Sequence, residues 1–236
     1  MEYFDEESGL QPYPFDGIDL KQSVSPKNSK LRNCIGYIDY YDRYYSRKFS
    51  LIDNTFCNWF FGIFAWLFNR KGTFLQIPLV FIVSNIYSED LMLQLGKKDL
   101  NPLKLSWFFF IYVMFGFVIL IVGTVLPLKA VIGRERPTRI TSVYRILNMR
   151  DLEHGKAMPS GDSACCTYFC CMYSIVFGFH WAMLIIPFTC LGRVYVHCHW
   201  IGDTVAGFIL GSITAYVFFY AHFITLSNPI YQMVFQ

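Results

Sequence analysis

The sequence has few charged residues. Asp, Glu, Lys and Arg make up 16 % of its 236 residues, against roughly 25 % in an average soluble domain. The formal net charge of +3 is too small to favour DNA or RNA as the general partner. This shortage of charge argues against a soluble globular protein and against a disordered chain, and we expect no nucleic-acid partner.

Paired cysteine spacing is also missing. The eight cysteines do not form the two matched Cys-x-x-Cys pairs that a structural zinc site favours, nor a disulfide scaffold. Four of them, Cys165, Cys166, Cys170 and Cys171, lie close together in apolar sequence. A metal or redox site is one interpretation of this group. We favour small, polarisable residues that pack a membrane helix, and we predict no metal and no cofactor.

The start of the chain lacks the features of a targeting segment. It reads Met-Glu-Tyr-Phe-Asp-Glu-Glu, without the basic and apolar layout of a secretory signal or the Arg-rich layout of a transit peptide. Residues 1–50 are polar, with a tyrosine-rich stretch from Tyr37 to Tyr45. They predict an extra-membrane N-terminal arm, and a loosely ordered tail is the alternative.

Long apolar segments are abundant, since hydrophobic residues make up 54 % of the chain. A membrane-spanning helix needs about 20 mostly apolar residues. Four segments meet this standard well, and two more, 54–68 and 73–95, are shorter or carry charge near one end. The four stronger segments are 105–128, 163–179, 181–198 and 204–236.

These segments predict an all-α fold, a polytopic membrane helix bundle of about six transmembrane helices. We expect the bundle to form one domain over residues 51–236. The protein is expected to be an integral membrane protein in contact with membrane lipids. Which membrane holds it, and in which orientation, stays open, and segment 54–68 is also compatible with an interfacial helix.

Polar residues near the ends of these segments are candidates for a site, because ionisable groups at a membrane boundary are costly. Lys129 and Arg136 are seven residues apart, hence on one face if the helix continues past Leu128. Two such cations could hold a phosphate, Arg136 as a planar fork and Lys129 as a point charge. Cations that reach toward lipid headgroups are the alternative.

Two further motifs follow. Ser160 and Gly161 precede a predicted helix, where backbone N–H groups can bind an anion, although an ordinary helix cap is the alternative. His199 and Asp203 are four residues apart, so on a helix the carboxylate can orient the imidazole as a nucleophile. Arg193 is six residues before His199, and the two can share a site only if the helix breaks between them.

Together the three motifs resemble the signature of the type 2 phosphatidic acid phosphatase superfamily, which also includes glucose-6-phosphatase and the vanadium haloperoxidases. That signature is Lys, six residues, Arg-Pro; then Pro-Ser-Gly-His; then Ser-Arg, five residues, His, three residues, Asp. The resemblance covers about residues 105–225, with Gly192 in place of the usual Ser. The residues that match the first and third motifs are Lys129, Arg136, Pro137, Arg193, His199 and Asp203.

The resemblance implies a role for each of these residues. It implies that His199 attacks phosphorus and that Asp203 orients His199. The residues that it implies for holding the phosphoryl oxygens are Lys129, Arg136, Arg193, Ser160 and Gly161.

One position departs from the signature. Asp162 stands where the superfamily has the histidine that protonates the departing alkoxide. An ordinary aspartate titrates near 3.9, so near pH 7 it is an anion without a proton to donate. A general acid is typically worth about 10²- to 10⁴-fold in rate, and weak turnover is therefore expected. His154, His197 or burial of Asp162 could each restore a proton donor.

Two functions follow. The first is a membrane-embedded lipid phosphate phosphatase that hydrolyses a phosphomonoester headgroup through a phosphohistidine, with activity impaired by Asp162. The alternative is a catalytically inactive pseudoenzyme, an accessory subunit that binds a lipid headgroup and other membrane subunits, with the tyrosine-rich arm as the docking segment.

Overall fold

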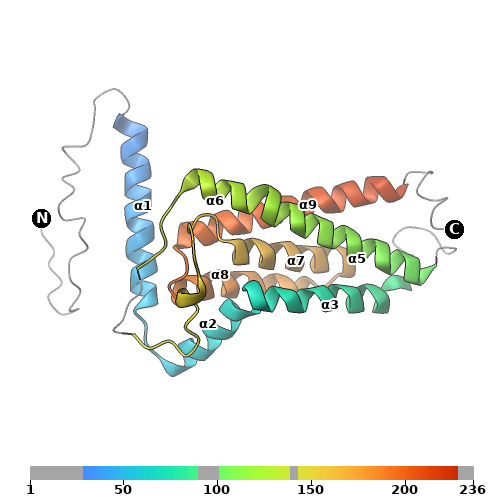
Figure 1. Cartoon of the computed structure of the whole chain (residues 1–236), viewed down its shortest axis with the longest axis horizontal. Helices are drawn as coiled ribbons and strands as arrows, with labels where there is room; N and C mark the ends of the chain where they lie inside the picture. Colours follow the sequence, from blue (N-terminus) through green and yellow to red (C-terminus); the bar gives the residue numbers. More distant parts are fainter. Residues whose placement is uncertain (1–28, 90–100, 139–142, 228–236) are drawn as a thin grey trace, which may run out of the picture. The chain divides into compact units, whose positions relative to one another are not determined.

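The computed structural model describes residues 29–89, 101–138 and 143–227, which form helices and connecting segments with no β-strand among them (Figure 1). The chain divides into two units, Met1–Tyr41 and Asp42–Gln236. Helix α1 (Ser29–Ser50) begins in the first unit and ends in the second. Within the first unit, Tyr40 and Tyr41 are in edge-to-face contact. The second unit holds the remaining helices and every residue of the candidate site.

The second unit is an all-α helix bundle. Asparagine and proline mark the starts of three of its helices: Asn54 caps α2, Asn69 caps α3, and Asn101 followed by Pro102 begins α5. The asparagine side chains accept from the first backbone N–H groups of these helices, and proline has no N–H that would need a partner. The elements in chain order are α2 (Thr55–Leu67), α3 (Arg70–Ile86), α5 (Pro102–Val118), η4 (Ile119–Val125), α6 (Leu126–Ile132), η5 (Arg150–Leu152), α7 (Gly161–Phe177), η6 (His180–Leu184), α8 (Ile185–Tyr195) and α9 (Ile201–Ser227).

Helix α7 is the central helix of this unit. It packs along α9 and also contacts α8, α5 and α3 (Figure 1). Nearly all of its residues from Ser163 to Val176 are buried. The four cysteines of this helix are among them, and each has at most 8 % of its surface exposed. A helix surrounded by other helices has little contact with lipid, which accounts for its short and moderately apolar sequence.

Two glycines allow α9 to approach α7 closely. A Cβ atom at Gly207 would lie 2.4 Å from the carbonyl oxygen of Ser160, and one at Gly211 would lie 2.4 Å from that of Ala164. Glycines four residues apart lie on one face of a helix, and small residues at such positions are typical of close helix packing in membranes. This packing fixes the start of α7 against the first turns of α9, where Asp203 lies.

Helices α5 and α6 form one continuous run with the π-helical segment η4 between them. The run extends beyond the predicted 105–128, from Pro102 to Ile132. Pro127, the second residue of α6, has no N–H for the regular helical ladder, which accounts for the wider turn before it. The helix ends at Gly133, whose φ of +64° is left-handed, so Arg136 comes from the segment after the helix and not from the helical face that Lys129 occupies.

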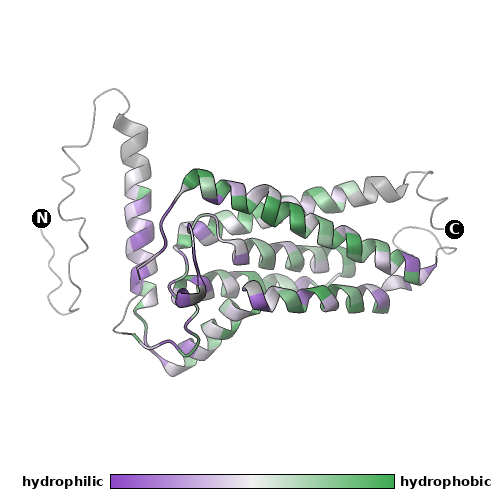
Figure 2. Ribbon diagram, in the orientation of Figure 1, coloured by the Kyte–Doolittle hydropathy of each residue, from purple (hydrophilic) through white to green (hydrophobic). Residues whose placement is uncertain are grey.

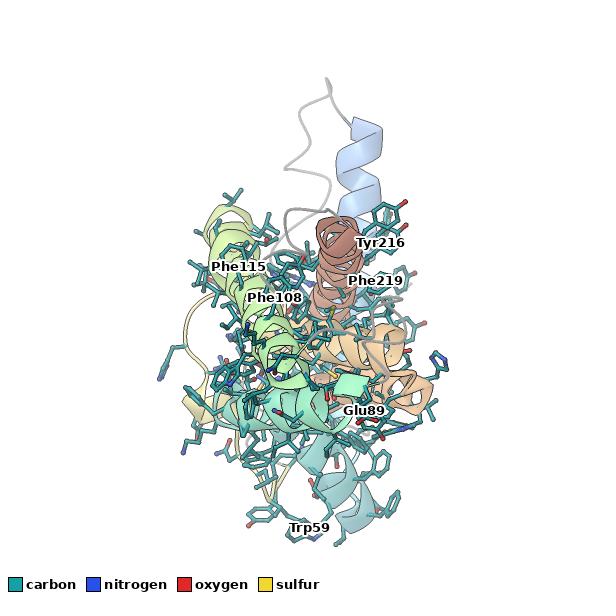
Figure 3. All side chains as sticks on the ribbon, turned by 90° about the vertical axis from the view of Figure 1, so that its right-hand side faces the viewer. Trp59, Glu89, Phe108, Phe115, Tyr216 and Phe219 are labelled. Atoms are coloured by element: carbon teal, nitrogen blue, oxygen red, sulfur yellow. The ribbon has the colours of Figure 1, made fainter. Side chains whose placement is uncertain are left out.

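The protein is an integral membrane protein. Among the described residues, two helical runs, Pro102–Ile132 and Ile201–Ala221, are long and apolar enough to cross a membrane. In both, less than a third of the most apolar window is buried inside the protein, and the hydrophobic colour follows α5, η4 and α6 in Figure 2. Phe115 and Tyr216 point away from the bundle, with 57 % and 62 % of their surfaces exposed (Figure 3). Exposed apolar surfaces along helices of this length are stable in contact with lipid and not with water.

The count of about six spans stays a prediction. Helix α2 has 13 residues and is therefore about 20 Å long, shorter than a hydrocarbon core of about 30 Å. Helix α3 has 17 residues and contains Pro78. The end of the predicted segment 73–95 and the last part of segment 204–236 lie outside the described residues. The division into an arm over 1–50 and a domain over 51–236 also stays a prediction.

The close packing of α7 and α9 predicts a strong effect of bulk at Gly211. Gly211→Val places carbon atoms where the Ala164 carbonyl lies, so the helices must separate, at a cost of roughly 1–3 kcal/mol or more. We expect the thermal unfolding temperature of the purified protein in detergent to fall clearly. Gly123→Val is the matched control, because a Cβ atom there would meet only Ile119 at 3.7 Å. Equal unfolding temperatures for the two variants would contradict the packing.

Candidate active site

The site lies where the segment after α6, the segment before α7 and the α8–α9 connection meet. Arg136 Nη1 lies 3.2 Å from His199 Nε2 and donates to the carbonyl oxygen of Cys198 at 2.9 Å. Arg193 on α8 reaches the same place, because Glu153 binds both arginines. The three motifs recognised in the sequence therefore converge.

The α8–α9 connection contains the helix break that the six-residue spacing required. Helix α8 ends at Tyr195 and α9 begins at Ile201. Between them His197 has a φ of +60°, which reverses the chain, and the backbone amides of Cys198 and His199 return to the carbonyl oxygen of Arg193 at 3.1 and 3.3 Å. The chain thus brings the backbone of His199 back to Arg193.

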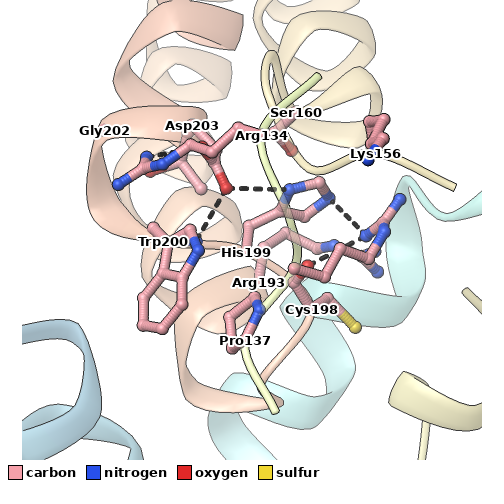
Figure 4. Close-up of polar contacts among 12 residues, drawn as sticks. Arg134, Pro137, Lys156, Ser160, Arg193, Cys198, His199, Trp200, Gly202 and Asp203 are labelled. Atoms are coloured by element: carbon pink, nitrogen blue, oxygen red, sulfur yellow. Dashed lines mark hydrogen bonds and ion pairs between the residues drawn. The ribbon is translucent and has the colours of Figure 1, made fainter. Parts of the chain in front are cut away.

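His199 has its two ring nitrogens in opposite environments. Nδ1 lies 3.6 Å from Asp203 Oδ2 (Figure 4), and Nε2 faces the guanidinium of Arg136. A guanidinium has no acceptor, so Nε2 must carry the lone pair and Nδ1 the proton. Burial lowers the pKa of His199 well below its ordinary value, and Arg193 and Arg136 lower it further. The imidazole is therefore neutral, and its unprotonated Nε2 is directed at Arg136.

Asp203 is held by groups that the sequence reasoning missed. Its Oδ1 accepts from Arg134 at 2.7 Å, and its Oδ2 accepts from the backbone N–H of Trp200 at 2.9 Å (Figure 4). Arg134 also donates to Asp42 at 2.6 Å. Asp203 is fully buried, and a buried carboxylate is tolerated only when it is paired in this way.

Asp42 connects the second half of α1 to the site. Its Oδ1 accepts from the backbone N–H of Gly202, and the hydroxyl of Ser46 accepts from that of Ile201. These side chains satisfy the first amides of α9, which have no partner within the helix. In the sequence, the position of Arg134 two residues before Arg136 was the one sign that it could belong to the site. Nothing in the sequence linked Asp42 to residues more than ninety positions away.

Arg136 and Arg193 share one carboxylate. Glu153 Oε1 accepts from Arg193 at 2.5 Å, and Oε2 pairs with Arg136 at 3.0 Å. Burial alone would raise the pKa of Glu153, but Arg193 and Arg136 lower it to about 2. Glu153 is therefore an anion at neutral pH. Sequence reasoning missed it and considered its neighbour His154, which is exposed.

Asp162 pairs with Arg193 at 2.7 Å. This carboxylate lies in the first turn of α7. One guanidinium nitrogen, Arg193 Nη2, contacts both Asp162 and Glu153. The pairing that the sequence predicted for Asp162 with one of the three cations is present. His197 is tied elsewhere, because its Nε2 lies 3.0 Å from the carbonyl oxygen of Ser50. His154 is exposed. Burial of Asp162, the third route to a proton donor, is present and raises the pKa of this carboxyl group, although Arg193 lowers it in part.

Ser160 and Gly161 start α7. The hydroxyl of Ser160 accepts from the amide of Ser163 and caps the helix, and the Ser160 amide donates to the carbonyl oxygen of Asp203 at 2.9 Å. The helix cap that was the alternative interpretation of Ser160 is thus present. The amides of Gly161 and Asp162 belong to the same first turn, whose N–H groups have no partner within the helix and favour an anion.

Lys129 lies at the edge of the site. Its Nζ donates to the carbonyl oxygen of Lys156 at 3.2 Å, and it lies within electrostatic range of Arg136, Glu153, Asp162 and Arg193.

Gly192, which replaces the serine of the signature, packs against α2, where a Cβ atom would lie 2.7 Å from the carbonyl oxygen of Phe61. The space beside Arg193 therefore has no room for a larger residue at this position.

Comparison with known proteins agrees with this arrangement. The family model of the PAP2 superfamily matches residues 105–226, which are more than half of the chain. The chain belongs to the PAP2 superfamily. A search of curated proteins found no match.

Among solved structures, the first transmembrane PAP2-type phosphatidylglycerolphosphate phosphatase from Bacillus subtilis is similar to this chain. The TM-score is 0.57 at 18 % sequence identity, and the alignment covers 82 % of this chain and 89 % of that one. The PAP2 membrane fold expected from the sequence is thus confirmed.

The Arg134 contacts predict that this residue matters for stability as well as for the site. Arg134→Gln would leave Asp203 buried with one ionic partner fewer, and the loss of one partner of a buried pair typically costs about 3–5 kcal/mol. We expect a clearly lower unfolding temperature in detergent. Lys104→Gln, at an exposed lysine of α5, is the charge-matched control, and an Arg134 variant as stable as this control would rule the anchoring role out.

Proposed function

We propose that the protein binds phosphate monoester headgroups of membrane lipids and hydrolyses them weakly through a phosphohistidine at His199. The observation that carries this proposal is the orientation of His199, whose Nδ1 lies 3.6 Å from Asp203 while Nε2 faces the buried guanidinium of Arg136. A neutral imidazole with a free nitrogen beside two cations has the requirements of a nucleophile for phosphorus. Membership of the PAP2 superfamily supports the reaction class.

The chemistry takes two steps. The lone pair of His199 Nε2 forms a bond to phosphorus while the bond from phosphorus to the lipid oxygen breaks, and the departing alkoxide takes up a proton. Water then attacks phosphorus, the N–P bond breaks, and inorganic phosphate leaves with His199 neutral again. Arg136, Arg193 and Lys129 stabilise the charge on the phosphoryl oxygens, assisted by the amides at the start of α7.

The weak point is the proton for the alkoxide. Asp162 holds the position of the general acid in the superfamily signature. Burial is the larger influence and raises the pKa of its carboxyl group above the ordinary value, whereas the ion pair with Arg193 requires the ionised form. An ionised carboxylate cannot protonate the lipid oxygen, and it competes with phosphate for the same guanidinium. We therefore propose an impaired phosphatase.

The contact of Asp162 with Arg193 also supports the second candidate, an accessory membrane subunit that binds a lipid headgroup without turnover. In this alternative the pocket keeps its cations but has lost the proton donor. The two candidates share the phosphate site and differ only in the chemical step.

Restoration of the proton donor tests the first candidate. Purified wild-type protein should release phosphate from phosphatidate feebly, Asp162→His should raise turnover by about 10²-fold or more, and His199→Ala should remove turnover completely. His180→Ala is the matched histidine control, because His180 lies on η6 and bonds Ser174.

Two outcomes would change this account. A robust wild-type rate with a bell-shaped pH profile near neutrality would mean that another group supplies the proton. An inactive Asp162→His protein that still binds vanadate would favour the accessory subunit.

A further inference from the structure

Glu153 occupies the position between the two arginines of the site. One carboxylate oxygen binds Arg193 and the other binds Arg136, as two oxygens of a phosphoryl group would do. Arg136 also lies within 3.2 Å of the nucleophilic nitrogen of His199. A phosphate placed for attack by His199 must therefore take the contacts that Glu153 now makes.

The arginines are fixed, whereas the carboxylate can leave. The side chains of Arg193 and Arg136 are 0 % and 4 % exposed, but that of Glu153 is 21 % exposed. The backbone around Glu153 is anchored, because Arg150 donates to its carbonyl oxygen and Arg136 donates to that of Gly155. A rotation of the Glu153 side chain toward solvent is thus sufficient to open the position, without movement of the segment.

Charge decides which ligand can displace this side chain. A tethered carboxylate competes at a high effective concentration, and it carries one negative charge. A phosphodiester also carries one, so exchange of Glu153 for a phosphodiester gains no attraction to the arginines. A phosphate monoester carries two charges near pH 8, and its attraction to the same two cations is about twice as large.

We propose that Glu153 is an internal competitor that weakens the binding of every anion to Arg136 and Arg193, so that monoanionic phosphodiester headgroups do not occupy the site and dianionic phosphate monoesters, which bind more strongly, still do. A cationic site at a membrane boundary is surrounded by phospholipids, whose headgroups are mostly phosphodiesters at high local concentration. An internal carboxylate keeps these from occupying the arginines. The proposal rests on the proposed function for the substrate class, but it concerns binding and does not require turnover.

The test measures binding of two small anions to the purified full-length protein in detergent at pH 8. Dimethyl phosphate represents the monoanion and methylphosphonate the dianion, which has no ester bond to cleave. Wild type should bind the dianion at least about tenfold more tightly than the monoanion. Glu153→Gln keeps the shape but removes the charge, and it should tighten the binding of both anions by about tenfold or more, while the dianion keeps its preference over the monoanion.

Two further variants sharpen the comparison. Glu89→Gln removes a charge from an exposed carboxylate after α3 and should leave both affinities unchanged. Glu153→Asp keeps the charge on a side chain one methylene shorter, which can reach only one arginine. Its monoanion affinity should lie between those of wild type and Glu153→Gln, and it provides the comparison if Glu153→Gln does not fold.

The outcomes separate this proposal from the proposed function. If the dianion binds but the affinity of each anion is the same in wild type, Glu153→Gln and Glu153→Asp, the role of Glu153 is wrong and the phosphate site stands. If neither anion binds any of these proteins, the phosphate site itself is wrong. An increase in the affinity for both anions, confined to the Glu153 variants, is the result that we expect.

Discussion

Two buried guanidinium groups impose the main constraint on this structure. Arg193 and Arg136 lie beside a neutral histidine in a site that excludes most solvent, and a buried cation is tolerated only with an anionic partner. In the described structure Glu153 and Asp162 supply the negative charge. A phosphate group can supply it instead, so the carboxylates and the ligand are alternatives for the same cations.

The fold serves this constraint by fixing Asp203, the carboxylate beside the nucleophile, independently of the side chains of the two arginines. Gly207 and Gly211 bring α9 against α7, and the amide of Ser160 bonds the carbonyl oxygen of Asp203. Arg134 then holds the carboxylate of Asp203 from the other side. Because these contacts do not involve Arg136 or Arg193, the arginines can exchange partners while Asp203 keeps its position.

Local spacing made much of the site predictable from the sequence. The four-residue spacing of His199 and Asp203 and the required break after Arg193 depend only on helix geometry, and the all-α membrane fold follows from apolar length. Glu153, Arg134 and Asp42 could not be found this way. They are charged residues in polar segments, and their partners lie 40, 69 and 92 residues away in the chain. Only the tertiary packing of the helices reveals these pairs.

A structure of the protein with vanadate, which resembles the five-coordinate transition state of phosphoryl transfer, tests the central claim most directly. The account predicts vanadium bonded to His199 Nε2, vanadate oxygens on Arg136 and Arg193, and Glu153 turned away from both arginines. Vanadate bound elsewhere, with Glu153 still between the two arginines, would contradict the assignment of this site as the phosphate subsite.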